Sequence, residues 1–220
     1  MKHANQLPKQ MKKTGLFIAV IIALFAMQGC ETEVAPTSPL EGTEYTTLKT
    51  AMRKLWGDHM QWTYATVDAF YHNPDGLQAQ LDRLLQNQKD IGAAIVPYYG
   101  QAAGDALTNL LTIHIQQSVP VLTAARNGDQ AALDKALSDW YANAKEIADF
   151  LSAANPTHWP QSATEPMLEE HISTTTTYAV DLLQKNYTKA IEDYDHAFAH
   201  MMMLADVLAD GIAKQFPDKF

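Results

Sequence analysis

The clearest helical pattern in the chain is DYDHAFAHMMMLADVLADG, Asp193 to Gly211. Apolar residues recur there every three or four positions, as they do on the buried face of an amphipathic helix. With its flanking residues, the apolar stripe comprises Ile191, Tyr194, Phe198, Met201, Ala205, Leu208 and Ile212. The segment also carries two histidines four residues apart, followed by three methionines. The spacing predicts a helix, and the histidines raise the question whether that helix binds a ligand.

The same spacing continues through most of the remaining chain and is interrupted by short segments rich in proline, glycine, asparagine and aspartate. These interruptions separate six expected helices, at 44–72, 77–96, 101–125, 129–154, 166–184 and 187–215. No alternating pattern typical of β-strands lies between them. The sequence therefore predicts an all-α protein, an up-and-down helical bundle of about six segments. We expect the longest loop, Asn155–Pro166, to expose Trp159 to a partner.

A weak internal similarity suggests that one helical hairpin has been duplicated. A shift of 57 positions places His114 over His171, and it places IADFL at 147–151 over LADVL at 204–208. Two copies of one hairpin would each bring a histidine to the same depth of the bundle.

The N-terminal region is typical of an export signal. From Met11, two lysines precede an apolar run of about a dozen residues, and small residues then lead to Cys30. The run is too short for a comfortable membrane span. The position of Cys30 resembles the lipobox of bacterial lipoproteins, in which the cysteine is acylated, although Met27 and Gln28 depart from the usual residues.

We therefore expect a signal peptide at 1–30, with either Met1 or Met11 as its start, and a flexible Pro/Thr/Glu-rich tether at 31–43. The helical bundle domain would occupy 44–220, lipid-anchored to the cell membrane on its extracytoplasmic face. A cleaved export signal with an incidental cysteine is the alternative.

Composition excludes several classes of function. The formal net charge is −9 and the acidic residues are spread along the chain, so nucleic acid is not an expected partner. Cys30 is the only cysteine, and the bundle therefore has no disulfide and no thiolate. The chain has no glycine-rich phosphate loop, no Gly-x-Ser-x-Gly and no His-Glu-x-x-His, which disfavours nucleotide-dependent enzymes, common serine hydrolases and standard zinc proteases.

Histidines lie on apolar faces of several expected helices. His59, His114 and His171 each stand in the middle of an apolar stripe, so three helices direct an imidazole towards the core. Burying an imidazole costs free energy unless both ring nitrogens find partners, whereas one shared ion would engage several rings at once.

The last expected helix adds Asp193, His196 and His200, spaced i, i+3, i+7, so that their side chains can converge on one point. We therefore predict a transition metal ion (Cu, Zn or Fe) or a haem, which would be non-covalent because the chain has no C-x-x-C-H. The candidate ligands are His59, His114, His171, His196, His200 and Asp193, with Met203 as an additional candidate.

Two other interpretations stay open. The chain could be a metal-free interaction or scaffold domain of the cell envelope, with the histidines as core residues. It could also be an enzyme that uses a histidine and Asp193 or Asp206 as general acid and base, although no substrate pocket is marked. Binding, sensing or delivery of a metal remains the leading hypothesis.

Three segments, LWGDHMQWT, PYYGQAAG and GIAKQFPDKF, together resemble an uncharacterised family of bacterial helical exported proteins. The resemblance covers nearly all of 44–220. Some members of that family carry names such as glycosyltransferase or acetylglutamate kinase, which imply nucleotide-sugar or ATP sites on α/β sheets. Nothing in this sequence supports either site, and the resemblance implies no functional residue.

Overall fold

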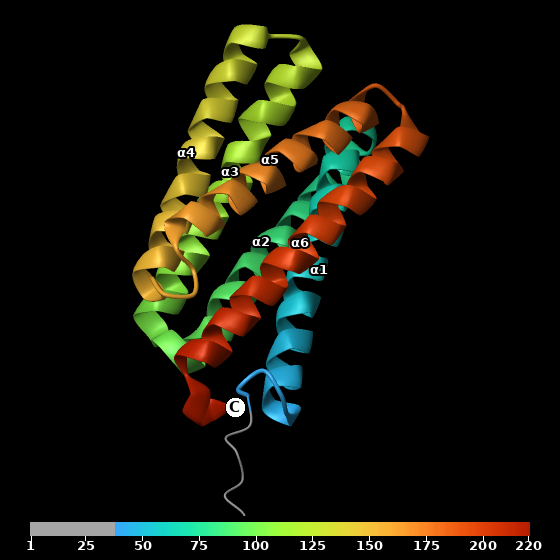
Figure 1. The fold of residues 1–220 in the computed structure, drawn as a ribbon. Helices are drawn as coiled ribbons and strands as arrows, with labels where there is room; N and C mark the ends of the chain where they lie inside the picture. Colours follow the sequence, from blue (N-terminus) through green and yellow to red (C-terminus); the bar gives the residue numbers. More distant parts are fainter. Residues whose placement is uncertain (1–37) are drawn as a thin grey trace, which may run out of the picture. The chain divides into compact units, whose positions relative to one another are not determined.

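A computed structural model describes residues 38–220. The predicted signal peptide, Cys30 and most of the predicted tether lie outside the described residues. The described part consists of α1 (Thr43–His72), α2 (Pro74–Tyr99), α3 (Gln101–Asn127), α4 (Gln130–Ala154), α5 (Gln161–Leu183), α6 (Tyr187–Gln215) and the short 3-10 helix η1 (Pro217–Lys219) (Figure 1). Residues 38–220 contain no strand, which confirms the predicted all-α bundle.

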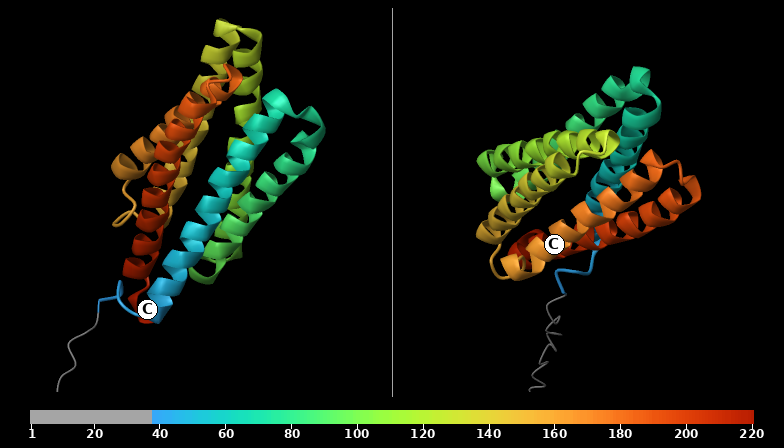
Figure 2. Two further views of the ribbon diagram at one scale, coloured as in Figure 1. Left: turned by 90° about the vertical axis from the view of Figure 1, so that its right-hand side faces the viewer. Right: turned by 90° about the horizontal axis from the view of Figure 1, so that it is seen from above.

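The six long helices form a closed ring of antiparallel neighbours (Figures 1 and 2). Each helix packs against the next one in sequence, and α6 packs back against α1. The odd-numbered helices α1, α3 and α5 also contact one another across the interior. Side chains on their inward faces therefore meet at the centre of the bundle.

Local sequence explains where several helices begin and end. α2 begins at Pro74, because proline lacks an N–H and fits the first turn of a helix. α3 ends at Asn127, and the next residue, Gly128, has a left-handed φ of 67°, which favours glycine. Asp129 then caps α4, its Oδ1 accepting a hydrogen bond from the backbone N–H of Ala132 at 3.0 Å.

The predicted long loop is shorter than expected, and its tryptophan is not exposed. α5 begins at Gln161 rather than at 166, and Trp159 is only 2% exposed. The indole packs against α6 and donates from Nε1 to the carbonyl oxygen of Val207 at 3.1 Å. It fits there because residue 211 is glycine: a Cβ at Gly211 would lie 2.0 Å from Nε1. The expectation of an exposed partner-binding tryptophan is therefore wrong.

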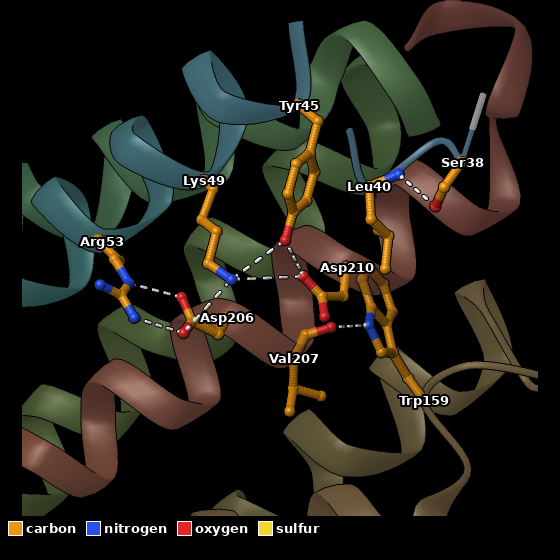
Figure 3. A network of polar contacts seen from close by, with 9 residues as sticks. All are labelled: Ser38, Leu40, Tyr45, Lys49, Arg53, Trp159, Asp206, Val207 and Asp210. Atoms are coloured by element: carbon orange, nitrogen blue, oxygen red, sulfur yellow. Dashed lines mark hydrogen bonds and ion pairs between the residues drawn. The ribbon is translucent and has the colours of Figure 1, made fainter. Parts of the chain in front are cut away.

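A polar network joins α1 to α6 (Figure 3). Arg53 donates to both carboxylate oxygens of Asp206, at 2.6 and 2.5 Å. Lys49 lies between Asp206 and Asp210, and Tyr45 donates to Asp210 at 2.5 Å. The Arg53 hydrogen bonds hold the pKa of Asp206 below its usual range. Asp206 is thus an ion-paired carboxylate on the flank of the bundle.

In the part of the chain that the structure describes, no helix combines the length and the apolar character that a membrane crossing requires.

Candidate ligand site at three buried histidines

Three of the predicted ligands meet in the core. His59 of α1, His114 of α3 and His171 of α5 are 1%, 3% and 3% exposed. The ring centroid of His171 lies 5.5 Å from that of His59 and 5.7 Å from that of His114. Each imidazole comes from the first helix of a different hairpin, so the ring of helices brings together residues that are far apart in sequence.

Two of these histidines contact a polar residue on the second helix of their own hairpin. Gln88 of α2 contacts His59, and Asn143 of α4 contacts His114; in both pairs the partner follows the histidine by 29 residues. His200 of α6 follows His171 by the same interval. The interval is a signal in the sequence that the motif analysis missed.

A second contact repeats in all three hairpins. In each, a side-chain nitrogen from the second helix donates to the backbone carbonyl four residues before the histidine. The three bonds are Asn87 Nδ2 to Leu55 O at 2.9 Å, Asn143 Nδ2 to Leu110 O at 3.3 Å, and His200 Nε2 to Met167 O at 2.7 Å. The sequence similarity links only the second and third hairpins. This hydrogen bond is shared by all three hairpins, including the first.

The hydrogen bonds of Asn143 determine the tautomer of His114. Since the amide nitrogen of Asn143 donates to Leu110, its Oδ1 faces Nδ1 of His114 at 2.9 Å and accepts the proton that Nδ1 carries. Nε2 of His114 then bears a lone pair, and it is buried without a hydrogen-bond partner among the described residues. Proteins orient metal-binding histidines by the same device, a hydrogen bond from the non-ligating nitrogen to an oxygen.

His59 and His171 differ from His114 in the hydrogen-bond partners of their ring nitrogens. Nε2 of Gln88 lies 3.3 Å from Nδ1 of His59 and also donates to the carbonyl of Leu84. Nδ1 of His59 is therefore an acceptor, and its Nε2 carries the proton. In His171, Nδ1 is buried and has no partner within residues 38–220. Among the described residues, the cluster thus contains two fully buried ring nitrogens without a hydrogen-bond partner, Nε2 of His114 and Nδ1 of His171.

Burial keeps the cluster uncharged. Desolvation lowers the pKa of His59 to about 3, helped by repulsion from His114, and it lowers the pKa of His114 to about 4. The pKa of His171 falls well below its ordinary value, first through burial and then through the neighbouring imidazoles of His59, His114 and His200. All three rings are neutral at pH 7, which is the state that metal ligation requires.

A cavity of about 100 Å³ borders the three imidazoles. Its other walls are mostly apolar and come from α1, α2, α3 and the indole of Trp140 on α4. Some of its lining residues are partly exposed: Leu77 and Leu81 of α2 are half-buried, and Val119 of α3 is 38% exposed. The three imidazoles therefore border a cavity whose other walls are mostly apolar.

The predicted ligands on α6 do not join the cluster. His196 is exposed, Met203 is 56% exposed, and Asp193 pairs with Lys189, which lowers its pKa. His200 is buried, but its Nε2 donates to Met167 O and its Nδ1 lies 3.5 Å from Glu170.

α6 buries most of its predicted apolar stripe: Met201, Ala205, Leu208 and Ile212 are at most 4% exposed, and only Ile191 near the start of the helix is 55% exposed. On the other predicted line, His196 and Met203 face solvent. Contrary to the sequence prediction, Asp193, His196 and His200 do not converge on one point.

The three imidazoles lie near one another, but they do not form a metal site in the observed conformation. Within residues 38–220, no group of three or more His, Cys, Asp or Glu side chains is positioned to hold an ion as it stands. Two imidazoles on one tetrahedral ion have ring centres about 5 Å apart, given metal–nitrogen bonds of about 2.0–2.1 Å. The observed separations of 5.5 Å between His59 and His171 and 5.7 Å between His114 and His171 are close to this value.

A haem does not fit this cavity. Pockets for drug-sized ligands measure roughly 300–1,000 Å³, and a porphyrin belongs in that range, whereas the cavity beside the histidines measures about 100 Å³. Of the two predicted cofactors, a single ion matches the available space.

No protein-family model matches the chain. No curated protein shows significant similarity to it. No solved structure does so either.

Proposed function

We propose that this protein binds one transition metal ion through His59, His114 and His171. Imidazole ligands without thiolates suit zinc, copper, nickel or iron, and the exposed position of Met203 removes the thioether that would favour reduced copper. The role would be binding, sensing or delivery of the ion. As the signal-like N-terminus and Cys30 suggest, it would take place at the extracytoplasmic face of a membrane to which the chain is lipid-anchored.

The observation that carries the proposal is the lone pair of His114 Nε2. A buried polar atom without a partner costs about 1–3 kcal/mol, and here Asn143 holds the ring in the orientation that leaves Nε2 unpartnered. The unpartnered Nδ1 of His171 lies in the adjacent ring. An ion between the two rings would engage both nitrogens, and His59 would complete the set after exchanging its tautomer.

The test is a metal titration of the full chain, purified without a histidine tag and stripped with EDTA. We expect one ion per chain by calorimetry for Zn²⁺, and a visible absorption spectrum of tetrahedral type for Co²⁺. His114→Gln and His171→Gln should each abolish the Co²⁺ spectrum. The matched control is His196→Gln on α6, which removes an exposed imidazole and should leave the titration unchanged.

A second set of variants tests the orientation of His114. Asn143→Leu removes the oxygen that fixes the tautomer, and it should weaken metal binding about 10- to 100-fold. Asn143→Asp keeps an oxygen acceptor at the same place and should bind within a few-fold of the unchanged protein. No stoichiometric binding, or equal affinity in His114→Gln and the unchanged protein, would overturn the proposal.

The alternative function is a metal-free interaction domain of the cell envelope. The hydrogen bond between Gln88 and His59 favours it, because that bond leaves the Nε2 of His59 protonated and unable to bind an ion. The same titration separates the two functions. A protein that binds no ion, and whose stability is unchanged by Zn²⁺, would have its histidines as core residues.

A further inference from the structure

The residue that follows each core histidine by 29 positions differs in its side chain among the three hairpins. It is Gln88 in the first hairpin, Asn143 in the second and His200 in the third. The two amides contact Nδ1 of their core histidines, at 3.3 and 2.9 Å. In the third hairpin, Nδ1 of His171 is buried and has no hydrogen-bond partner within residues 38–220. The third hairpin therefore lacks a contact that the first two make.

His200 occupies the same register in the third hairpin as Asn143 does in the second. Nδ2 of Asn143 donates to the backbone oxygen of Leu110 at 3.3 Å, and Nε2 of His200 donates to that of Met167 at 2.7 Å. Each of these oxygens belongs to the residue four positions before the core histidine of its hairpin. The missing contact at His171 therefore comes from the type of side chain at position 200, since the two hairpins pair their helices alike.

An amide and an imidazole differ in what they offer once the backbone bond is made. Asparagine carries a donor and an acceptor side by side, so Asn143 donates from Nδ2 and accepts the proton of His114 with Oδ1. A neutral imidazole has one donor and one acceptor on separate ring nitrogens. Nε2 of His200 donates to the backbone, and its Nδ1 lies 3.5 Å from Glu170. His200 thus makes the backbone contact but no hydrogen bond with His171.

The missing acceptor determines which nitrogen of His171 carries the proton. Buried N–H groups without an acceptor are rarer in proteins than buried acceptors without a donor, so the proton of the neutral ring belongs on Nε2. Nδ1 of His171 then keeps its lone pair. In the neighbouring ring, Asn143 does the opposite and holds the proton of His114 on Nδ1, which leaves the lone pair on Nε2. The two side chains, Asn143 and His200, therefore set the two lone pairs that the proposed ion would engage.

We propose that His200 is a positioning residue of the metal site, which keeps Nδ1 of His171 free to bind the ion because it is a histidine and not an amide. The inference rests on the proposed metal function and adds to it a residue that does not bind the ion itself. His200 acts through His171: it holds the backbone of α5 at Met167 and withholds the acceptor that would take the proton of Nδ1.

The first test is His200→Asn, which gives the third hairpin the side chain of the second. Long-range proton–nitrogen NMR spectra of the metal-free full chain should show the proton of His171 on Nε2 in the unchanged protein and on Nδ1 in the variant. Calorimetry should show Co²⁺ binding weakened about 10-fold or more, while the midpoint of urea unfolding is retained. The matched control is His196→Asn, the same change at an exposed position of α6, which should alter neither the tautomer nor the affinity.

The second test, His200→Ala, separates positioning from a merely structural role. It removes the hydrogen bond to Met167 and should lower the midpoint of urea unfolding. It supplies no acceptor, so Nδ1 of His171 stays free, and the Co²⁺ spectrum should persist with an affinity within a few-fold of the unchanged protein. The two variants thus have opposite effects: asparagine retains stability and weakens binding, whereas alanine lowers stability and retains binding.

An unchanged tautomer of His171 or an unchanged Co²⁺ affinity in His200→Asn would overturn the inference, and so would loss of the Co²⁺ spectrum in His200→Ala. Failure of His200→Asn to fold, seen by far-ultraviolet circular dichroism, would also overturn it, because positions 143 and 200 would then not be equivalent. Failure of the proposed function gives a different result. If the unchanged protein binds no Co²⁺, the metal site is refuted, whereas the NMR comparison of the metal-free chains still decides whether residue 200 sets the tautomer of His171.

Discussion

Acid should destabilise this bundle through its buried histidines before the carboxylates begin to titrate. In the unfolded chain a histidine has a pKa of about 6.5, whereas burial lowers the pKa of His59 to about 3 and that of His114 to about 4 in the folded protein. Below pH 6.5 the unfolded state therefore binds more protons than the folded state, and the free energy of unfolding falls as the pH falls. At pH 7 this loss of unfolding free energy is nearly absent.

The size of the effect follows from the same pKa values. Each group costs about 1.4 kcal/mol for every pH unit between its unfolded and folded pKa. At pH 5 this amounts to roughly 2 kcal/mol for a single histidine, and so to roughly 4 kcal/mol for His59 and His114 together. His171, whose pKa is also well below the ordinary value, adds to the loss. A domain with a stability of about 5–15 kcal/mol would lose a large part of it.

Urea unfolding of the metal-free chain at pH 7, 6 and 5 measures this loss. The control is His114→Gln, which cannot titrate: its stability should fall by about 2 kcal/mol less between pH 7 and pH 5 than that of the unchanged protein. Carboxylates and exposed histidines contribute equally to both chains and cancel in the comparison. Parallel stability curves for the two proteins would refute the reasoning, because they would mean that His114 takes up its proton in the folded state.

Three further substitutions test the packing, the caps and the surface. Gly92→Ala would place a Cβ 1.9 Å from the hydroxyl oxygen of Thr108 where α2 crosses α3, so we expect a loss of at least about 2 kcal/mol in urea unfolding; a neutral result would show that the helices separate freely. Asp129→Ala removes the N-cap of α4 and should cost about 1 kcal/mol, with Asp129→Asn as the capping control that retains stability. Arg53→Ala breaks the bridge to Asp206, but Arg53 is 51% exposed at its side chain; solvent screening should hold the loss below about 1 kcal/mol, and a larger loss would mean that this bridge closes the ring of helices.

Most of the fold could be predicted from the sequence, because helical periodicity is a local property. The apolar spacing and the interruptions predicted six helices, and the structure contains them. The error lay in the start of α5, where proline at 166 suggested a loop but the chain is helical from Gln161. The indole of Trp159, just before the start of α5, is buried against α6. No local sequence pattern predicts such a contact.

The candidate site, like the fold, could be predicted from the sequence only in part. His59, His114 and His171 could be placed on inward faces because each stands among apolar neighbours three and four residues away. Their partners Gln88 and Asn143 could not be predicted from the sequence, because a hydrogen bond between two helices depends on how deeply and in which register the helices pack. That the three histidines bind a metal stays a prediction.

By itself the sequence determined the helices and the inward direction of three imidazoles, because both follow from the geometry of one helix at a time. The tertiary structure alone decided that His196 and Met203 of α6 face solvent, which buried ring nitrogens lack partners among the described residues, and that a small cavity lies beside the three imidazoles. The physical reason is that these properties belong to pairs and triples of helices. Close packing selects one rotation and one depth for each helix among several that its amphipathic pattern allows.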